Sequence, residues 1–320
     1  MEPHGVDSSE LHVTASIGIS VYPDDGANAE TLLKNADAAM YRAKESSHHS
    51  YRFFTPEMNI RAVERQSIEQ DLRRALERNE LSLEYQPILN LKSGAITGAE
   101  ALLRWTHPTR GPVASSVFIP VAEDSGLIVP IGAWVMREAC MQARDWMNAG
   151  LRSISMSVNV SALQFRSEGF LASVTRTLEE TGLSPASLNI EVTESALMER
   201  ARLGAPTLKT LRNNGVQVSV DDFGTGYSSL SYLQKLPVDA LKIDQSFVRQ
   251  ISRTPEDTTI VSAIISMGRS LKLKVIAEGV EVEHESDFLK AQDCDEAQGF
   301  FFGRPMIADK FAGLDSMQAN

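Results

Sequence analysis

The sequence contains few of the residues that mark disulfide-rich, zinc-binding or membrane-spanning proteins. Only two cysteines, Cys140 and Cys294, occur in 320 residues. A disulfide framework is therefore not expected, no Cys/His cluster offers a zinc site, and a reducing compartment is the simpler interpretation. The longest apolar run, residues 126–136, contains Pro130 and Gly132 and is too short to cross a bilayer. No secretory signal opens the chain, so we expect a soluble, cytoplasmic chain without membrane contact.

Positive charge is also scarce. The chain has 31 Lys and Arg against 42 Asp and Glu, a net charge of -11 at pH 7. A surface of this sign repels a phosphate polymer, so no nucleic-acid polymer is expected as a partner. A small phosphate ligand is still compatible with this charge if metal ions reverse it locally. The 42% hydrophobic and 23% charged residues are ordinary for a globular protein with a sizeable core.

The first 54 residues predict a small α/β fragment. Residues 12–22 are typical of a strand, residues 23–26 (PDDG) of a turn, and residues 29–45 of an amphipathic helix. One strand and one helix cannot enclose a core by themselves. Residues 55–66 are expected to connect this fragment to the following domain, within a helix over residues 59–78.

Residues 67–316 predict a single larger domain of alternating strands and helices. The strands are expected at residues 82–90, 96–105, 153–161, 188–194, 216–223, 240–247, 274–281 and 297–303. Helical patterns separate most of them, at residues 133–149, 170–181, 205–213 and 258–271. Eight such strands predict a (β/α)₈ TIM-like barrel. Only residues 91–95 join the first two strands, too few for a crossover helix, so one strand should be antiparallel.

Polar side chains recur in or at the ends of these predicted strands. They are Glu100, Asn159, Glu191, Asp221, Asp222, Lys242, Asp244, Glu278, Glu281 and Gln298. Strand interiors disfavour acidic residues, and several carboxylates converging on one mouth would repel each other without cations. Oxygen ligands favour Mg²⁺ or Mn²⁺ over zinc. The adjacent Asp221 and Asp222 suit two bridged ions that activate a water at a phosphorus centre.

Other interpretations of these residues exist. Any one of the acids could be a surface residue, and Lys242 with Asp244 could be a structural ion pair, although alternation puts both on one strand face. Asp222-Phe223-Gly224 is similar to a kinase metal-binding triplet. No glycine-rich loop or HRD segment accompanies that triplet, so a kinase is not expected.

Several short motifs occur in a fixed order along residues 67–312. The first, Glu100-Ala101-Leu102-Leu103-Arg104-Trp105, is preceded by QPI from residue 86. It is followed by SVNVS around Asn159, EVTES from 191, DDFGTGYSSL from 221, LKID from 241, AEGVE from 277 and QGF from 298. Together these motifs resemble the EAL family of cyclic di-GMP phosphodiesterases.

This resemblance implies hydrolysis of cyclic di-GMP to linear pGpG with two Mg²⁺ or Mn²⁺ ions. The implied ligands are Glu100, Asn159, Glu191 and Asp221 for the first ion, and Asp221, Asp222 and Glu278 for the second. The implied catalytic residues are Lys242, which orients or deprotonates the attacking water, Glu278 and Glu100. The implied substrate contacts are Gln86, Leu103, Arg104, Asp244, Glu281 and Gln298. Glu194 is implied to hold the loop at residues 221–230, and a homodimer is implied through the loop and helix after Asp222.

The N-terminal segments VTASIGIS and ADAAMYRAKE resemble the second half of a GGDEF diguanylate cyclase domain. The GGDEF signature and the nucleotide-binding half are absent from this chain, so cyclase activity is not expected. The resemblance implies a longer GGDEF–EAL protein, whose preceding segment could provide a sensor or a membrane tether.

Two alternatives to a working phosphodiesterase stay open. A catalytically silent cyclic di-GMP receptor would keep the fold, but the complete set of implied ligands argues against it. An enolase-type lyase would explain the carboxylates and the lysine. It would not explain the ordered motifs.

Overall fold

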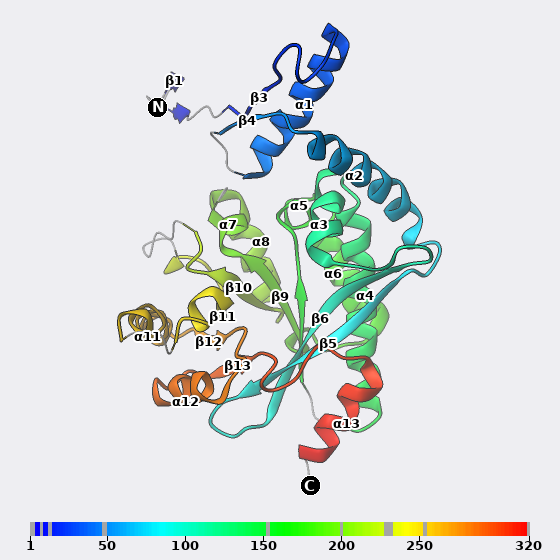
Figure 1. The fold of residues 1–320 in the computed structure, drawn as a ribbon. Coiled ribbons are helices and arrows are strands. Elements are labelled where there is room, and N and C mark those ends of the chain that lie inside the picture. The colour runs from blue at the N-terminus through cyan, green and yellow to red at the C-terminus, as the bar shows by residue number, and fades with distance from the viewer. Residues whose placement is uncertain are drawn as a thin grey trace. The chain divides into compact units, whose positions relative to one another are not determined.

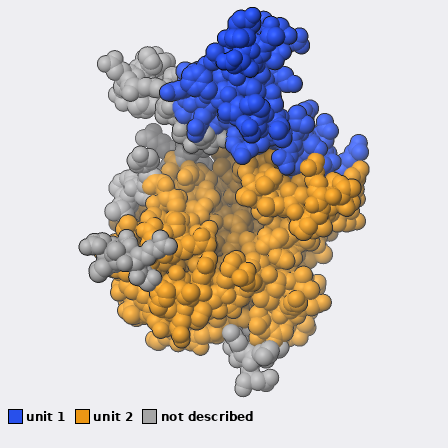
Figure 2. Space-filling model, viewed as in Figure 1, with its two compact units in different colours: residues 1–74 blue, residues 75–320 orange. Residues whose placement is uncertain are grey.

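The computed structural model describes residues 4–6, 9–11, 15–46, 50–151, 154–198, 201–226, 233–251 and 255–318 of the chain. The chain divides into two compact units, residues 1–74 and residues 75–320, which Figure 2 colours blue and orange. Within the described residues, no helix combines the length and the apolar character that crossing a membrane would need.

The first unit contains two small sheets and helix α1 (Ala29–Ser46). Strands β1 (His4–Val6) and β2 (Ser9–Leu11) pair antiparallel, and strands β3 (Ile17–Ile19) and β4 (Tyr51–Phe53) pair in parallel. The predicted helix is confirmed to within one residue. The strand predicted over residues 12–22 is shorter, since only residues 17–19 form it, and residues 12–14 lie outside the described residues.

Sheet β3–β4 and helix α1 pack closely but leave much apolar surface exposed. Gly18 lies directly against the α1 backbone at Ala36 and Met40, where a Cβ atom would have no room. Leu33 in the helix and Phe53 in β4 nevertheless stay 72% and 54% exposed. Two three-residue strands and one helix are too small to cover these side chains, as the sequence predicts.

Helix α2 (Pro56–Ala75) follows, with Pro56 at the first helical position, where no amide donor is needed. It buries Ile68, Leu72 and Ala75 at helical spacing. The helix continues through the predicted boundary between residues 66 and 67, and the division into compact units falls after Arg74.

The second unit contains a closed eight-stranded barrel (Figure 1). Its strands are β5 (Leu81–Asn90), β6 (Ile96–His107), β8 (Ser155–Asn159), β9 (Leu188–Thr193), β10 (Gln217–Phe223), β11 (Ala240–Ile243), β12 (Lys274–Ala277) and β13 (Glu296–Gln298). Strand β5 pairs antiparallel with both β6 and β13 and closes the ring, and the other barrel pairings are parallel. The predicted TIM-like barrel with one antiparallel strand is confirmed.

A tight hairpin makes strand β5 antiparallel. The Asn90 side chain accepts hydrogen bonds from the backbone amides of Lys92 and Ser93, at 3.1 and 2.9 Å, and so closes the turn. Strand β7 (Gly111–Val113) pairs antiparallel with residues 105–107 at the end of β6. The sequence does not predict this strand, because three residues with a central proline carry no strand pattern.

Helices cover the outside of the barrel. They are α3 (Ser115–Asp124), α4 (Ile128–Asn148), α5 (Ala162–Phe165), α6 (Phe170–Thr181), α7 (Glu194–Met198), α8 (Ala201–Asn213), α10 (Gln245–Val248), α11 (Pro255–Ser270), α12 (Glu283–Ala291) and α13 (Ala308–Gln318), with a 3₁₀ turn at Pro185–Ser187. Helix α4 starts five residues before its predicted start at residue 133, because a proline in the first turn costs no hydrogen bond. It buries an apolar stripe, including Ile131, Val135 and Ala139, and contacts strands β5, β6 and β8.

Three strands end four or five residues before their predicted last residue. Strand β11 ends at Ile243 because the Asp244 side chain accepts the amide of Ser246 and caps helix α10. Strand β12 ends at Ala277, shortly before Gly279 turns the chain at a φ of 70°. Strand β13 contains only Glu296–Gln298. In each case polar or glycine residues after the strand belong to the loops at the barrel mouth.

Candidate active site

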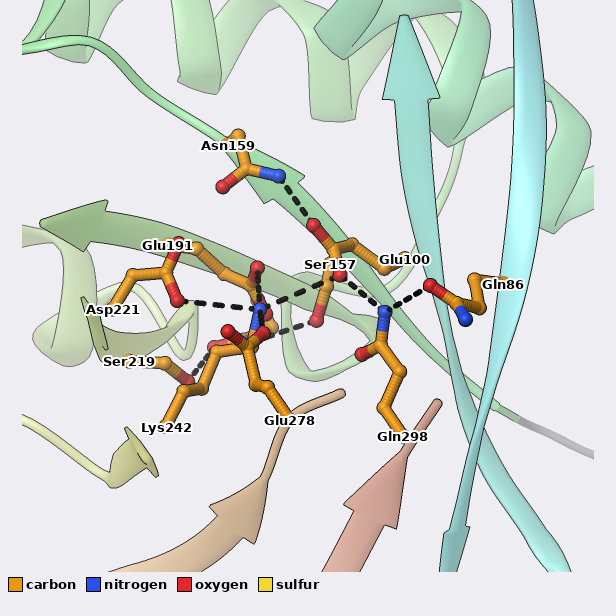
Figure 3. A network of polar contacts seen from close by, with 11 residues as sticks. Gln86, Glu100, Ser157, Asn159, Glu191, Ser219, Asp221, Lys242, Glu278 and Gln298 are labelled. Atoms are coloured by element: carbon orange, nitrogen blue, oxygen red, sulfur yellow. Dashed lines mark hydrogen bonds and ion pairs between the residues drawn. The ribbon is translucent and has the colours of Figure 1, made fainter. Parts of the chain in front are cut away.

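The barrel directs the predicted polar side chains toward one mouth (Figure 3). They come from β6 (Glu100), β8 (Asn159), β9 (Glu191), β10 (Asp221), β11 (Lys242) and β13 (Gln298), with Glu278 directly after β12. Because seven of the eight strands are parallel, their carboxyl ends meet at this end of the barrel, where catalytic groups of such barrels lie. The structure therefore brings together residues up to 198 positions apart in the chain.

The Lys242 ammonium lies at the centre of this group. Its side chain is fully buried, and Nζ lies 2.5 Å from Glu191 Oε2, 2.6 Å from Glu278 Oε1, 3.4 Å from Glu100 Oε2 and 3.5 Å from Asp221 Oδ1. Burial lowers the pKa of Lys242, but these carboxylates outweigh it and hold the pKa well above its usual value. The ammonium thus stays charged and neutralises part of the carboxylate ring.

Glu100 is held as an anion by hydrogen bonds. Burial raises the pKa of Glu100. Lys242 and the side-chain amides of Gln298 and Asn159 together lower it by more, so the pKa of Glu100 lies below its usual value. Each amide donates to Glu100 at 2.5 Å. These partners fix the orientation of both carboxylate oxygens.

Burial and repulsion between neighbouring carboxylates raise the pKa of three other acids at the site. Burial raises the pKa of Glu191 to about 8, and Glu100 and Asp221 add to the rise against the effect of Lys242. Burial, followed by Asp221 and Asp244, raises the pKa of Asp222 to about 6. Burial likewise raises the pKa of Glu278 well above its usual value. One ammonium cannot neutralise all these groups, and further cations would stabilise their ionised forms.

A bulge in β10 lets two adjacent aspartates face the same mouth. The pairing of β10 with β11 shifts register between Val220 and Phe223, and Asp222 has a φ of 52°. Neighbouring strand residues otherwise point to opposite faces, and a bulge changes this direction. Oxygen atoms of Asp221, Asp222 and Glu278 consequently lie within 4.8 Å of one another.

This group of oxygens fits divalent metal ions. Asp221 Oδ1 is buried and accepts no hydrogen bond from any described residue, and the nearest cation is Lys242 Nζ at 3.5 Å. A buried carboxylate oxygen without a donor is costly unless another ligand satisfies it. The atoms around this site that could bind a metal ion are carboxylate and amide oxygens. Mg²⁺ and Mn²⁺ are the ions that prefer such ligands.

A cavity of about 220 Å³ opens beside the carboxylates. Its lining includes Gln86, Glu281 and Gln298, which the sequence analysis assigned to substrate contact. Gln298 Nε2 donates to Gln86 Oε1 at 2.9 Å as well as to Glu100. Gln86 Nε2 in turn donates to the carbonyl of Gly303 at 3.0 Å. These bonds connect the cavity wall directly to a predicted metal ligand.

The remaining predicted substrate contacts differ in their surroundings. Arg104 is not part of the cavity lining; its Nε donates to Glu84 Oε2 at 2.7 Å. Asp244 caps helix α10 and lies close enough to Asp222 to raise its pKa. Strand alternation puts Leu102, and not Leu103, on the face of β6 that carries Glu100. The strand geometry therefore favours Leu102 over Leu103 as the leucine that faces the mouth.

Glu194 follows strand β9 and is buried. Its Oε2 accepts the backbone amide of Gly224 at 2.8 Å, two residues after Asp222. This bond links the start of α7 to the loop after β10, where the sequence analysis expected Glu194 to act. Residues 227–232 of the predicted loop and dimer contact lie outside the described residues.

Two groups of residues at the site were not predicted from the sequence. Gln245, Arg249 and Phe300 line the cavity; of these, only Phe300 falls within a motif quoted above, QGF from residue 298, and the motif gave it no role. The second group is buried beneath the ligands: Ser157, Asn189 and Ser219. A usable indication exists for this group, since each residue is polar, lies in a strand and precedes a predicted ligand by two positions.

Fold and site together define an α/β barrel with a carboxylate-rich, metal-type site at the carboxyl ends of its strands. The chain belongs to the EAL domain family, whose family model matches residues 69–305. A second family model, "Diguanylate cyclase, GGDEF domain", matches residues 1–50.

Curated relatives agree with this assignment. The chain is 46% identical over 309 residues to "Bifunctional diguanylate cyclase/cyclic di-GMP phosphodiesterase MucR" of Pseudomonas aeruginosa, a match covering 97% of this chain and 45% of the relative. It is 43% identical over 305 residues to "Cyclic di-GMP phosphodiesterase NbdA" of the same organism, covering 95% and 39%. The chain thus spans less than half the length of these relatives.

A solved structure titled "PaMucR Phosphodiesterase, c-di-GMP complex" is similar to this chain. It is 47% identical with a TM-score of 0.75, and the match covers 77% of this chain and 99% of that chain.

Proposed function

We propose that the chain is a cyclic di-GMP phosphodiesterase that needs divalent metal ions and releases linear pGpG. The observation that carries this proposal is the ring of buried carboxylates around Lys242, with the unsatisfied Asp221 Oδ1 at the mouth of an EAL barrel. The phosphodiesterase relatives and the cyclic di-GMP complex of a similar structure support the choice of substrate.

Two Mg²⁺ or Mn²⁺ ions are part of this proposal. Glu100, Asn159, Glu191 and Asp221 would hold the first ion, and Asp221, Asp222 and Glu278 the second. When bound, such ions lower the pKa of a coordinated water and stabilise charge on the leaving oxygen of a phosphodiester. The orphaned Asp221 oxygen and the bulge that turns Asp222 toward the mouth support a shared position for Asp221.

Lys242 would orient the attacking water and hold neighbouring carboxylates in place. A lysine acts as a base only when its pKa is lowered, whereas the carboxylates raise the pKa of Lys242. Its contact with Glu278 at 2.6 Å keeps the two groups on the same side of the site. We therefore propose that Lys242 acts through its position and charge, orienting the attacking water and the carboxylates around it.

The cavity beside the ring would take the nucleotide. Gln86, Asp244, Glu281 and Gln298 are proposed to contact it, together with Arg104 after release from Glu84. A homodimer through the loop and helix after Asp222 is proposed on the family resemblance alone. Sedimentation velocity over a range of concentrations tests it, and a monomer at all concentrations with full activity contradicts it.

The test of the function is hydrolysis by the purified chain. Incubation with cyclic di-GMP and Mg²⁺ or Mn²⁺, with and without EDTA, followed by chromatography, should yield pGpG only when metal is available. Glu100→Gln removes a proposed ligand and should lower the rate more than about 100-fold. Glu296→Gln, at a buried glutamate paired with Lys274, is the matched control and should leave the rate unchanged.

Nucleotide binding without metal-dependent cleavage would contradict the proposed reaction. It would identify the chain as a cyclic di-GMP receptor that keeps the barrel without using it for chemistry. Equal rates for the parent chain and Glu100→Gln would overturn the assignment of the site.

A further inference from the structure

Three buried polar side chains form a layer directly beneath the proposed ligands. Ser157, Asn189 and Ser219 are between 1% and 5% exposed and come from the adjacent parallel strands β8, β9 and β10. Burying polar groups inside a barrel is unfavourable unless they are fully hydrogen-bonded. Apolar residues would fill these positions at lower cost, so the layer calls for a functional explanation.

Hydrogen bonds connect this layer to a proposed ligand. Asn189 Nδ2 donates to Ser157 Oγ at 2.8 Å and to Glu191 Oε1 at 3.3 Å. Ser219 Oγ donates to Asn189 Oδ1 at 2.9 Å. The Asn189 amide therefore directs its Nδ2 hydrogens to Ser157 and Glu191, while its Oδ1 accepts from Ser219. Figure 3 shows Ser157 and Ser219 beside the ring of carboxylates.

Glu191 needs such an orienting group. Its side chain is fully buried, and Lys242 binds only its Oε2 atom, at 2.5 Å. The bond from Asn189 to Oε1 fixes the rotation of the carboxylate around its last torsion, which is otherwise a soft degree of freedom. A carboxylate held at both oxygens presents one defined direction to a metal ion.

The spacing along the strands indicates that this arrangement is systematic. Three pairs each consist of a buried polar residue and a proposed ligand two positions later: Ser157 and Asn159, Asn189 and Glu191, Ser219 and Asp221. Residues two apart in a strand point to the same face, so each polar residue lies below its ligand in the barrel interior.

We propose that Asn189 is a positioning residue of the metal site, which orients the Glu191 carboxylate as a ligand while Ser219 and Ser157 fix the Asn189 amide. The inference rests on the proposed function, because it requires Glu191 to bind metal. Hydrogen-bond partners of metal ligands change metal affinity or activity about 10–100-fold when they are removed.

The test measures Mn²⁺ affinity by isothermal titration calorimetry, independently of turnover. Asn189→Leu has nearly the same size but no donor, and it should raise the Kd for Mn²⁺ about 10–100-fold. Ser219→Ala removes only the hydroxyl that orients the amide and should raise the Kd by a smaller factor. At saturating Mn²⁺, the KM for cyclic di-GMP should stay within twofold of the parent value, because neither residue lines the substrate cavity.

Ser155→Ala is the matched control. Ser155 lies on β8 two residues before Ser157 and, together with Ser157, Asn189 and Ser219, lines a second, smaller cavity. Its hydroxyl has no hydrogen-bond partner among the described residues. Its removal should leave the Kd for Mn²⁺ unchanged. If Asn189→Leu does not fold, Ser219→Ala decides the question, with circular dichroism and the Tm verifying its fold.

Mn²⁺ affinities within twofold of the parent for the folded variants would overturn the inference while the proposed metal site stands. A lower Tm with unchanged affinity would do the same, since that is the result of a purely structural role. If the parent chain itself binds no Mn²⁺, the proposed function fails and the inference falls with it.

Discussion

At the residue scale, the site depends on a balance between one ammonium and several carboxylates. Lys242 contacts Glu191, Glu278, Glu100 and Asp221 within 3.5 Å, and it is completely buried. Removing one partner of a buried charge group leaves the others uncompensated. The lysine is therefore a structural requirement of the metal-free barrel as well as a candidate catalytic residue.

We predict that Lys242→Met destabilises the metal-free chain by about 3–5 kcal/mol. Mg²⁺ should restore more stability to this variant than to the parent, because the ions would replace the lost positive charge. Thermal unfolding in EDTA and in Mg²⁺ measures both effects. Lys290→Met is the control: Lys290 is 49% exposed and paired with Asp287, which is 65% exposed, and its loss should cost less than about 1 kcal/mol. Equal losses for both variants would contradict the prediction.

Metal binding should strengthen as the pH rises. Burial raises the pKa of Asp222 to about 6 and of Glu191 to about 8. A raised carboxyl pKa stabilises the metal-free fold at low pH, and this contribution is lost as the pH rises through the folded-state pKa. Metal ions require the ionised carboxylates, so binding competes with protons. The gain in Tm caused by Mg²⁺ should therefore grow between pH 5 and pH 9 in scanning fluorimetry. A gain independent of pH would show that these acids do not bind the metal.

At the element scale, strand β10 and the loop after it position two of the proposed ligands. The bulge in β10 turns Asp222 toward the mouth, and Glu194 at the start of α7 holds the amide of Gly224. A strand end alone does not fix such a loop. The hydrogen bond between Glu194 and Gly224 therefore connects the start of α7, directly after β9, to the loop that follows Asp221 and Asp222.

We predict that Glu194→Ala lowers kcat/KM roughly tenfold, because the Gly224 amide loses its acceptor and the loop after β10 loosens. Steady-state kinetics at saturating Mn²⁺ measure the effect. Glu296→Ala is the matched control, since Glu296 is also buried but lies at the start of β13 and pairs with Lys274. It should lower stability without lowering kcat/KM. Equal kinetic losses in both variants would indicate a general loss of folding.

At the scale of the whole molecule, the chain consists of two compact units that differ in how completely they bury their apolar side chains. Residues 75–320 enclose a complete barrel core, whereas residues 1–74 leave Leu33 and Phe53 largely exposed. All proposed metal ligands belong to the barrel unit. Metal ions should therefore stabilise only one of the two units directly.

Calorimetry should resolve two unfolding transitions. Mg²⁺ at about 100 times its Kd contributes about 2.7 kcal/mol, which corresponds to a rise of about 5–10 °C for a unit of this size. We predict this rise for the larger transition alone, with the smaller transition unchanged. A single transition that shifts as a whole would show that the two units unfold cooperatively.

Much of the fold and of the ligand set followed from the sequence alone. Strand alternation, helical spacing and the five-residue connection at residues 91–95 predicted the barrel and its antiparallel strand, since these patterns act over a few residues. The order of the motifs predicted Glu100, Asn159, Glu191, Asp221, Lys242 and Glu278, which the structure brings to one mouth.

Tertiary structure decided the features that depend on contacts between distant segments. The end of β11 is set by the Asp244 cap, the direction of Asp222 by a bulge against β11, and the layer under Glu191 by bonds between three strands. Arg249, which caps the end of helix α10, and Phe300, which follows strand β13, line the cavity only in the folded barrel. Local patterns determine which residues form strands and which face of a strand they occupy. The distances that turn these residues into a site arise only when the barrel closes.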